Sequence, residues 1–266
     1  MSKAINPTLC IIGGGNMGSA LARGLLASGF SRSQLVIVEK ENSRITELNE
    51  QFPQLEITTK LPDCESVVLA VKPTEVADVC RAVATAGAKQ ILSIAAGVTI
   101  SSIEGSIKTS VAVVRAMPNT PALIGQGASA MAASARCTPE NKKWAREILS
   151  SVGTVVEVQE NLLDAVTGLS GSGPAYVFLL AEALIAAGVQ QGLSAKDSNE
   201  LVVQLLVGSS LLLAESSETP EQLRKKVTSP NGTTAAGIAE LVGKQFSEII
   251  GSAVSAATKR SKELGK

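Results

Sequence analysis

The chain has 266 residues, of which 45% are hydrophobic, and its formal net charge at neutral pH is zero. A sizeable core is therefore expected, in one large domain or two ordinary ones. The balanced charge and the few aromatic residues exclude a typical nucleic-acid surface, which needs a basic face and stacking groups. The sequence has no histidine, which excludes Ser-His and Cys-His nucleophile pairs and nearly all zinc sites.

The sequence lacks the features that would indicate export from the cell or insertion into a membrane. The four cysteines form no C-x-x-C pair and are expected to be buried in a reducing compartment. Nothing near the N-terminus resembles a signal peptide. Glu182 and Gly208 interrupt the best apolar runs, so no membrane span is expected. We expect a cytoplasmic protein without metal, membrane or nucleic-acid partners.

The first predicted element is an apolar strand, Leu9–Ile12, which leads through glycines into a helical pattern. Gly13, Gly15 and Gly18 have the G-x-G-x-x-G spacing of a dinucleotide-binding turn. In that role they permit, in order, a tight turn, backbone approach to a pyrophosphate, and close packing of helix on strand. The helix N-terminus would offer N–H groups to the phosphates. The pattern predicts a nucleotide site, with an ordinary structural turn as the alternative.

A second predicted strand, Gln34–Glu39, ends in an acid at the expected distance from the glycines. An acid at this position favours the ribose hydroxyls of NADH and repels the 2′-phosphate of NADPH. Lys40 and Arg44 follow immediately and could hold that phosphate. The sequence therefore predicts NADPH or NADH as cofactor and leaves the preference open.

The rest of the first half alternates between strands and helices. Further strands are expected at residues 55–58, 66–71, 90–94, 111–115, 128–133 and 154–158, and helices at 42–51, 74–86 and 139–151. Strands that are apolar throughout are typical of a parallel sheet covered on both faces. We therefore expect residues 1–158 to form an α/β, Rossmann-like domain with a doubly wound parallel sheet.

From residue 159 onward the pattern is helical. Ala175–Val189 and Leu201–Ala214 are apolar nearly all round, so both helices must be buried on most sides. Ser194 and Asp197 are expected to cap the second helix. About a hundred residues are too few to bury both helices well. We expect residues 159–266 to form an all-α dimerisation domain; the alternative is a monomeric bundle packed on the first domain.

Two junctions in the helical half have the composition of binding loops. The glycines of Gly168–Tyr176 allow close backbone approach to a ligand or a tight connection between helices, and the two are compatible. Ser229–Ala236 forms a turn before a helix whose N–H groups could hold an anion such as a carboxylate. The alternative is simple N-capping by Thr233 or Thr234.

Together these motifs resemble the pyrroline-5-carboxylate reductase family, over essentially the whole chain. Two segments of the helical half, Thr167–Tyr176 and Ser229–Thr234, are more specific to this family than the glycine pattern of the nucleotide site. The resemblance is carried by Ile12–Gly18, Ala70–Pro73, Ser93–Val98, Arg115–Pro121, Thr167–Tyr176 and Ser229–Thr234.

The resemblance implies hydride transfer from NADPH or NADH to C5 of 1-pyrroline-5-carboxylate, giving L-proline in the final step of proline synthesis. This suits a chain without histidine, because a protonated imine is already an electrophile that chiefly needs positioning. It implies that Ser229 and the three residues Gly232, Thr233 and Thr234 bind the substrate carboxylate. It further implies that Thr234 is the catalytic residue near the ring nitrogen and that Glu160 lies near the substrate.

The resemblance also implies a set of cofactor-binding residues and an assembly. Asn231 stands where the family often has glycine, but asparagine tolerates left-handed backbone, so the turn is expected to survive. Family members are homodimers through the helical half, often assembled into rings of dimers. The implied cofactor contacts are Gly13, Gly15, Asn16, Met17, Gly18, Glu39, Lys40, Ala70, Val71, Lys72, Pro73, Ala95, Ala96, Gly97 and Asn119.

Two other functions compete with this one. A β-hydroxyacid dehydrogenase or imine reductase would have a similar architecture. The hydroxyacid enzymes need a lysine on a helix after the nucleotide domain, and Leu162–Ala187 contains none. A non-catalytic nucleotide-binding protein would not need a second, anion-holding loop.

Overall fold

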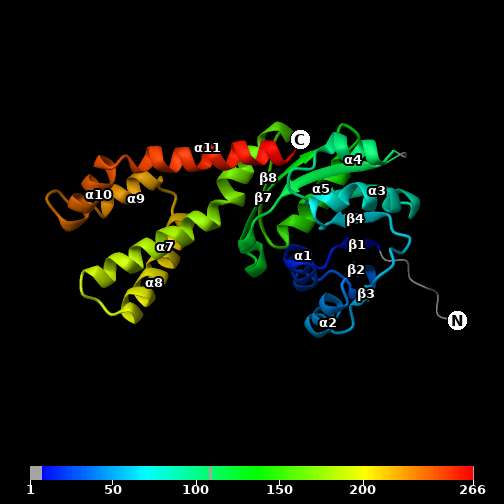
Figure 1. The fold of residues 1–266 in the computed structure, drawn as a ribbon, viewed down its shortest axis with the longest axis horizontal. Helices are drawn as coiled ribbons and strands as arrows, with labels where there is room; N and C mark the ends of the chain where they lie inside the picture. Colours follow the sequence, from blue (N-terminus) through cyan, green and yellow to red (C-terminus); the bar gives the residue numbers. More distant parts are fainter. Residues whose placement is uncertain (1–7, 108–109, 266) are drawn as a thin grey trace. The chain divides into compact units, whose positions relative to one another are not determined.

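The computed structural model describes residues 8–107 and 110–265 (Figure 1). The chain divides into two compact units, one formed by Met1–Ser172 with Ser255–Lys266 and the other by Gly173–Val254. This division differs from the predicted boundary after residue 158 because later segments are tied to the first unit. Asn119 Nδ2 donates to Ser170 O at 3.0 Å, and Ser261 Oγ donates to Asp164 Oδ1 at 2.6 Å.

The described part of the first unit contains an eight-stranded sheet in the order β3-β2-β1-β4-β5-β6-β7-β8. The first six strands are parallel, and the strand order reverses between β1 and β4. Ligands bind such sheets outside the carboxyl ends of the strands at this switch point. The strands are β1 (Leu9–Ile12), β2 (Leu35–Val38), β3 (Glu56–Thr58), β4 (Ser66–Leu69), β5 (Gln90–Ser93), β6 (Ala112–Met117), β7 (Gly127–Ala133) and β8 (Gly153–Glu157).

The last two strands extend the sheet as predicted, but not in parallel. β7 runs antiparallel to β6, and β8 runs parallel to β7. The connection from β6 to β7 is a short 3-10 turn, Thr120–Ile124, which ends at Gly125 with a φ of 73°. A parallel return needs a crossover of roughly a dozen residues or more, so this short turn reverses the chain direction. The predicted parallel sheet therefore ends in a mixed edge, whose strand directions the sequence pattern did not predict.

Helices cover both faces of the sheet, as the apolar strands predict. Within β1, Cys10 and Ile12 pack on one face with α3 and α4, whereas Leu9 and Ile11 pack on the other with α1, α2 and α5. Burial raises the pKa of the Cys80 thiol on α3 to about 11, so this thiol stays protonated. The helices are α1 (Asn16–Ala27), α2 (Asn42–Gln51), α3 (Val76–Thr85), α4 (Ile100–Ser106) and α5 (Pro139–Ser150).

Side-chain caps define several helix ends. Thr138 forms a capping box with Asn141 at α5. Ser194 accepts the N–H of Asp197 at α8 (Ala195–Glu215), as predicted. The sequence reading missed α4, because seven residues are too few for a helical period to stand out. Its cap, Thr99, accepts the N–H of Ser102.

The described residues of the second unit are helical, as predicted. Its helices are α7 (Gly173–Gln190), α8 (Ala195–Glu215), α9 (Pro220–Lys226), α10 (Thr233–Gly243) and the part of α11 (Phe246–Leu264) that ends at Val254. α7 and α8 pack as an antiparallel pair, and a Cβ on Gly188 would lie only 2.7 Å from Ser198 Oγ. A glycine there lets the two helices approach closely.

Large apolar side chains remain uncovered on these helices. Phe178 on α7 is 63% exposed and Leu205 on α8 is 53% exposed. An apolar surface of this kind marks an interaction site. The observation favours a second copy of the chain as the cover and disfavours a monomeric bundle.

The same apolar character has a second consequence. The helical run Glu160–Gln190 is long and apolar enough, by length and composition, to cross a membrane. The prediction that Glu182 would rule out such a run was wrong. A helix that packs against a second copy has the same composition, so the run is not in itself evidence for a membrane span.

We predict that Leu205→Asp breaks dimers or prevents soluble folding. Burying an unpaired carboxylate in an apolar interface costs on the order of several kcal/mol. Light scattering after size-exclusion chromatography measures the mass. Lys196→Glu, on the opposite side of α8 by helical spacing, should leave the dimer intact. A stable monomer formed by the unmodified protein would contradict this interpretation.

Candidate active site

The glycine loop after β1 has the geometry that its sequence predicts. Gly13 has a φ of 100°, and a Cβ there would lie 2.5 Å from Ala70 O on the neighbouring strand connection. A Cβ on Gly18 would overlap the carbonyl oxygen of Gly13, so α1 could not start so close to the strand. Around Gly15, by contrast, a Cβ would meet nothing within 4 Å. The turn and the close packing are therefore confirmed, and the backbone at Gly15 is open to an approaching phosphate.

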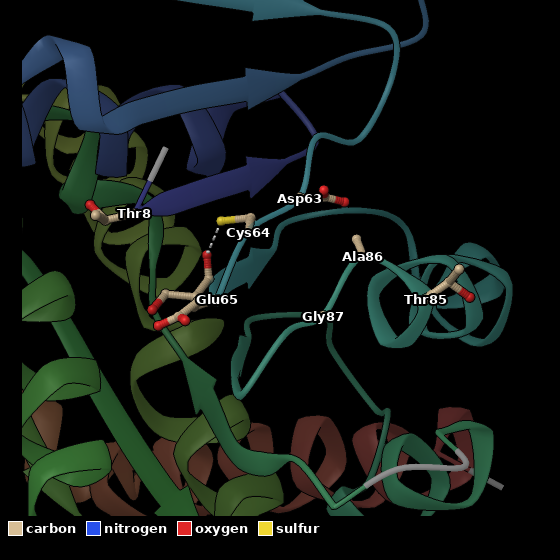
Figure 2. Close-up of a pocket in the computed structure, with 8 residues that line it drawn as sticks. Thr8, Asp63, Cys64, Glu65, Thr85, Ala86 and Gly87 are labelled. Carbon is tan, nitrogen blue, oxygen red and sulfur yellow. Dashed lines mark hydrogen bonds between the residues drawn. The ribbon is translucent and has the colours of Figure 1, made fainter. Parts of the chain in front are cut away.

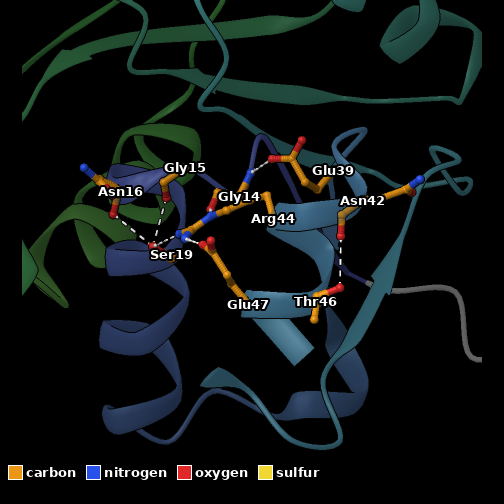
Figure 3. Close-up of polar contacts among 9 residues, drawn as sticks. All are labelled: Gly14, Gly15, Asn16, Ser19, Glu39, Asn42, Arg44, Thr46 and Glu47. Atoms are coloured by element: carbon orange, nitrogen blue, oxygen red, sulfur yellow. Dashed lines mark hydrogen bonds and ion pairs between the residues drawn. The ribbon is translucent and has the colours of Figure 1, made fainter. Parts of the chain in front are cut away.

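The middle residue of this loop, Gly14, is held from both sides (Figure 3). Glu39 Oε2 accepts the Gly14 N–H at 2.8 Å, and Arg44 Nε donates to the Gly14 carbonyl at 2.6 Å. Arg44 also donates to Ser19 Oγ at 3.2 Å and pairs with Glu47 at 2.5 Å. Glu39, which directly follows β2, and Arg44 of α2 thus fix the glycine loop.

Glu39 is fixed further by its own neighbours. Its Oε1 accepts the N–H groups of Lys40 at 2.7 Å and Glu41 at 3.1 Å. Together with the Gly14 N–H, three backbone groups hold the Glu39 side chain in one position. Glu39 is therefore a stationary negative charge at the carboxyl end of β2.

A cavity of about 560 Å³ lies beside this loop, at the carboxyl ends of β1, β2 and β4. Its wall combines the glycine turn, charged groups, and an apolar surface from Leu61, Val79 and Ala82. Close backbone, an apolar wall and nearby cations suit a dinucleotide, so the residues present fit a nicotinamide cofactor. The predicted cofactor residues that line it are Gly13, Gly15, Glu39, Lys40, Ala70, Val71 and Lys72.

An ion pair crosses part of this cavity wall. Lys40 Nζ lies 2.6 Å from Glu75 Oε1, which comes from the 3-10 turn Pro73–Glu75 after β4. The contact raises the pKa of Lys40 and lowers that of Glu75, because each charge favours the ionised form of the other. Both groups therefore stay charged at neutral pH. Glu75 was not predicted from the sequence.

A second cavity, also of about 560 Å³, opens at the amino ends of β1 and β4 (Figure 2). Its wall includes Asp63, Cys64 and Glu65, and none of its described lining residues is a lysine or arginine. Cys64 Sγ donates to Ser66 O at 3.0 Å. Acidic walls far from the glycine loop do not suit a dinucleotide.

The other predicted cofactor residues lie outside the lining of the first cavity. Asn16, Met17 and Gly18 form the first turn of α1, and Pro73 begins its 3-10 turn. Ala95, Ala96 and Gly97 follow β5, where Gly97 has a φ of 78°. Gly97 and Pro73 instead line a smaller cavity of about 260 Å³ with Leu264 and Gly265. Their contact with a cofactor stays a prediction.

Asn119 is buried, and its side chain serves the structure of the first unit. Its Oδ1 accepts the N–H of Ala128 at 2.8 Å while its Nδ2 donates to the Ser170 carbonyl. It thus joins the start of β7 to the helical segment after β8. A cofactor contact of Asn119 stays a prediction.

The predicted binding loop at Gly168 is helical instead. A 3-10 turn (Glu160–Leu162) leads into α6 (Leu163–Val166) and then into a π-helix, Thr167–Gly171. Such widened turns are rare and often occur at functional sites. A Cβ on Gly171 would come within 2.9 Å of Met117 Cε, so glycine lets this turn pack on β6. The glycine is therefore used for close packing within the first unit, and backbone approach to a ligand stays a prediction.

Glu160 joins two elements of the first unit. Its Oε1 accepts the N–H of Ile100 at 2.7 Å and a hydrogen bond from Arg115 Nη1 at 3.1 Å. The Arg115 side chain is buried, and a buried cation without a partner is strongly unfavourable. The sequence reading missed this role of Arg115, although a single arginine in an apolar strand was a signal.

The predicted substrate loop belongs to the second unit. Asn231 has a φ of 61°, so the expected left-handed turn is confirmed. Gly232 is the N-cap of α10, and Thr233 and Thr234 are its first residues. The alternative in which a threonine caps this helix was wrong. In the described residues, no side chain satisfies the N-terminal N–H groups of α10.

Comparisons with known proteins cover both halves of the chain. Residues 160–264 match the family model for pyrroline-5-carboxylate reductase dimerisation, and residues 8–97 match the model for NADP oxidoreductase, coenzyme F420-dependent. The pyrroline-5-carboxylate reductase of Synechocystis sp. is 42% identical over 97% of this chain and 98% of its own. The chain belongs to the pyrroline-5-carboxylate reductase family. The resemblance stated from the sequence motifs is confirmed.

Solved structures agree with the family assignment. A pyrroline-5-carboxylate reductase from Coxiella burnetii superimposes with a TM-score of 0.91 at 34% identity, covering 98% of this chain and 99% of that one. The Plasmodium falciparum pyrroline carboxylate reductase, solved with NADP bound, gives a TM-score of 0.82 at 32% identity, covering 99% of this chain and 100% of that one. The predicted fold class and the NAD(P) cofactor are confirmed.

We predict that Glu39→Ser shifts coenzyme preference toward NADPH. The fixed carboxylate repels a 2′-phosphate, and each 1.4 kcal/mol of repulsion removed is worth about tenfold. The ratio of the two values of kcat/KM measures the shift. The lost contact to Gly14 should also lower the melting temperature. Glu41→Ser, which removes a neighbouring charge, is the matched control. An unchanged ratio would place Glu39 away from the ribose.

Proposed function

We propose that the protein performs its family's reaction with the cofactor along the glycine loop and the substrate at the start of α10. The chain is an NAD(P)H-dependent reductase that converts 1-pyrroline-5-carboxylate to L-proline, the last step of proline biosynthesis. The observation that carries this function is the match to family members over nearly the whole chain. A nicotinamide cofactor, when bound, supplies the hydride.

The residues around the first cavity hold the cofactor. Gly13 and Gly15 bring backbone close to the pyrophosphate, and Asn16, Met17 and Gly18 offer the N-terminus of α1 to its charge. Glu39 and Lys40 act at the ribose. The nicotinamide end is held by Ala70, Val71, Lys72, Pro73, Ala95, Ala96, Gly97 and Asn119.

The N-terminus of α10 holds the substrate carboxylate. Backbone N–H groups of Gly232, Thr233 and Thr234, with the Ser229 hydroxyl, donate to the anion, and the uncapped helix end supports this role. The Thr234 hydroxyl contacts the ring nitrogen, where charge changes as hydride arrives. Glu160, which uses Oε1 within the protein, contributes its carboxylate near the substrate.

The chain forms a homodimer through residues 160–264, in keeping with the dimerisation model and the exposed apolar helices. We propose that dimers assemble further into rings and that the enzyme is a soluble protein of the cytoplasm. The absence of lysine in Leu162–Ala187 and the family match disfavour a β-hydroxyacid dehydrogenase. The family match also disfavours a binding protein without turnover.

Absorbance of the reduced cofactor tests the reaction directly. We expect NADPH and NADH absorbance to fall when 1-pyrroline-5-carboxylate is added and to stay constant without it. An open-chain β-keto acid serves as the comparison substrate, since a hydroxyacid dehydrogenase would turn it over. Absorbance that stays constant with the pyrroline would contradict the proposed function.

We predict that Thr234→Val lowers turnover while leaving the affinity for the cofactor nearly unchanged. Valine keeps the shape and removes the hydroxyl contact, and a hydrogen bond to a charged group contributes roughly 1.5–3 kcal/mol. Steady-state kinetics and a melting curve are measured on the one variant. Normal turnover with a lowered melting temperature would end the substrate-site interpretation of Thr234.

A further inference from the structure

The charge of the cofactor cavity is balanced. Its described lining contains three cations, Lys40, Arg44 and Lys72, and three carboxylates, Glu39, Glu41 and Glu75. NADPH carries a 2′-phosphate that NADH lacks, which adds roughly two negative charges. The balance between these side chains therefore sets how strongly that phosphate is attracted.

The charged groups differ in how firmly they are held. Glu39 accepts three backbone N–H groups, and Arg44 donates to the Gly14 carbonyl and to Ser19. Lys40 has one side-chain contact in the described structure, the ion pair to Glu75. The two side chains are 66% and 36% exposed, so this pair contributes little stability and is easily exchanged.

The two partners come from different strand connections. Lys40 follows β2, the strand whose end faces the ribose in this fold, whereas Glu75 follows β4. Their contact draws the Lys40 ammonium toward the β4 side of the cavity. A ligand phosphate near the end of β2 must therefore compete with Glu75 for the same cation.

We propose that Glu75 tunes coenzyme preference by competing with the 2′-phosphate of NADPH for Lys40. The proposal rests on the proposed cofactor site. Paired with Glu75, Lys40 offers little net charge, so NADH and NADPH are bound with similar strength. Without the Glu75 charge, Lys40 is released and the lining carries one net positive charge, which favours NADPH.

A double-mutant cycle on nucleotide binding tests this mechanism. Dissociation constants for 2′,5′-ADP and 5′-AMP are measured by calorimetry on the unmodified protein, Glu75→Gln, Lys40→Met and the double variant. We expect Glu75→Gln to bind 2′,5′-ADP about three- to tenfold more tightly, while its affinity for 5′-AMP changes less than about twofold. In the Lys40→Met background, Glu75→Gln should have no further effect.

The controls separate this mechanism from a general charge effect. Glu41→Gln removes the same charge from the same cavity, and its side chain forms no ion pair in the described residues, so it should change 2′,5′-ADP affinity less than Glu75→Gln. Unchanged 2′,5′-ADP affinity in Glu75→Gln would overturn the proposal. So would a gain that persists in the Lys40→Met background, because Glu75 would then act without Lys40.

The proposed reaction can fail independently of this proposal. If the unmodified protein binds 2′,5′-ADP but does not oxidise NADPH with 1-pyrroline-5-carboxylate, the reaction is wrong and the binding cycle still decides the role of Glu75. If the reaction occurs and the cycle shows no coupling between Lys40 and Glu75, only the role of Glu75 is wrong. The ratio of kcat/KM for NADPH and NADH should follow the calorimetric ratio.

Discussion

The close approach of α1 to β1 is the constraint on which the cofactor site depends. Gly18 sits against the Gly13 carbonyl, and Gly13 in turn sits against Ala70 at the end of β4. No side chain fits at either contact, so the turn and both strand ends have one arrangement. The glycine loop can present its backbone to a pyrophosphate because the rest of the loop cannot move away.

Charged side chains around the glycine loop hold it in this arrangement. Glu39 and Arg44 hold the Gly14 peptide, which couples the end of β2 and helix α2 to the phosphate loop. Glu160 likewise connects two parts of the first unit, because it accepts hydrogen bonds from Arg115 and from the N–H of Ile100 at the start of α4. In both places one carboxylate satisfies backbone N–H groups as well as acting as a charge. A residue that a family assigns to ligand contact can thus also be part of the framework around the ligand.

Sequence patterns predicted the parts of this structure that depend on local chemistry. The glycine spacing, the apolar strands, the cap at Ser194 and the left-handed Asn231 each follow from a few neighbouring residues. The misses depend on partners far along the chain. Lys40 meets Glu75, and Arg115 meets Glu160, only after the sheet has formed. The π-helix likewise packs through Gly171 against Met117, a residue of β6 that lies far from it along the chain.

The return of the chain from the second unit to the first has a consequence for how the protein is made. Residues 255–266 belong to the first compact unit, so the second unit is an insertion with two covalent connections to the first. On the ribosome, Asp164 emerges before the second unit, but its contact with Ser261 must wait until the whole of that unit has been synthesised. The nucleotide-binding unit is therefore completed only after the helices of the insertion have been released.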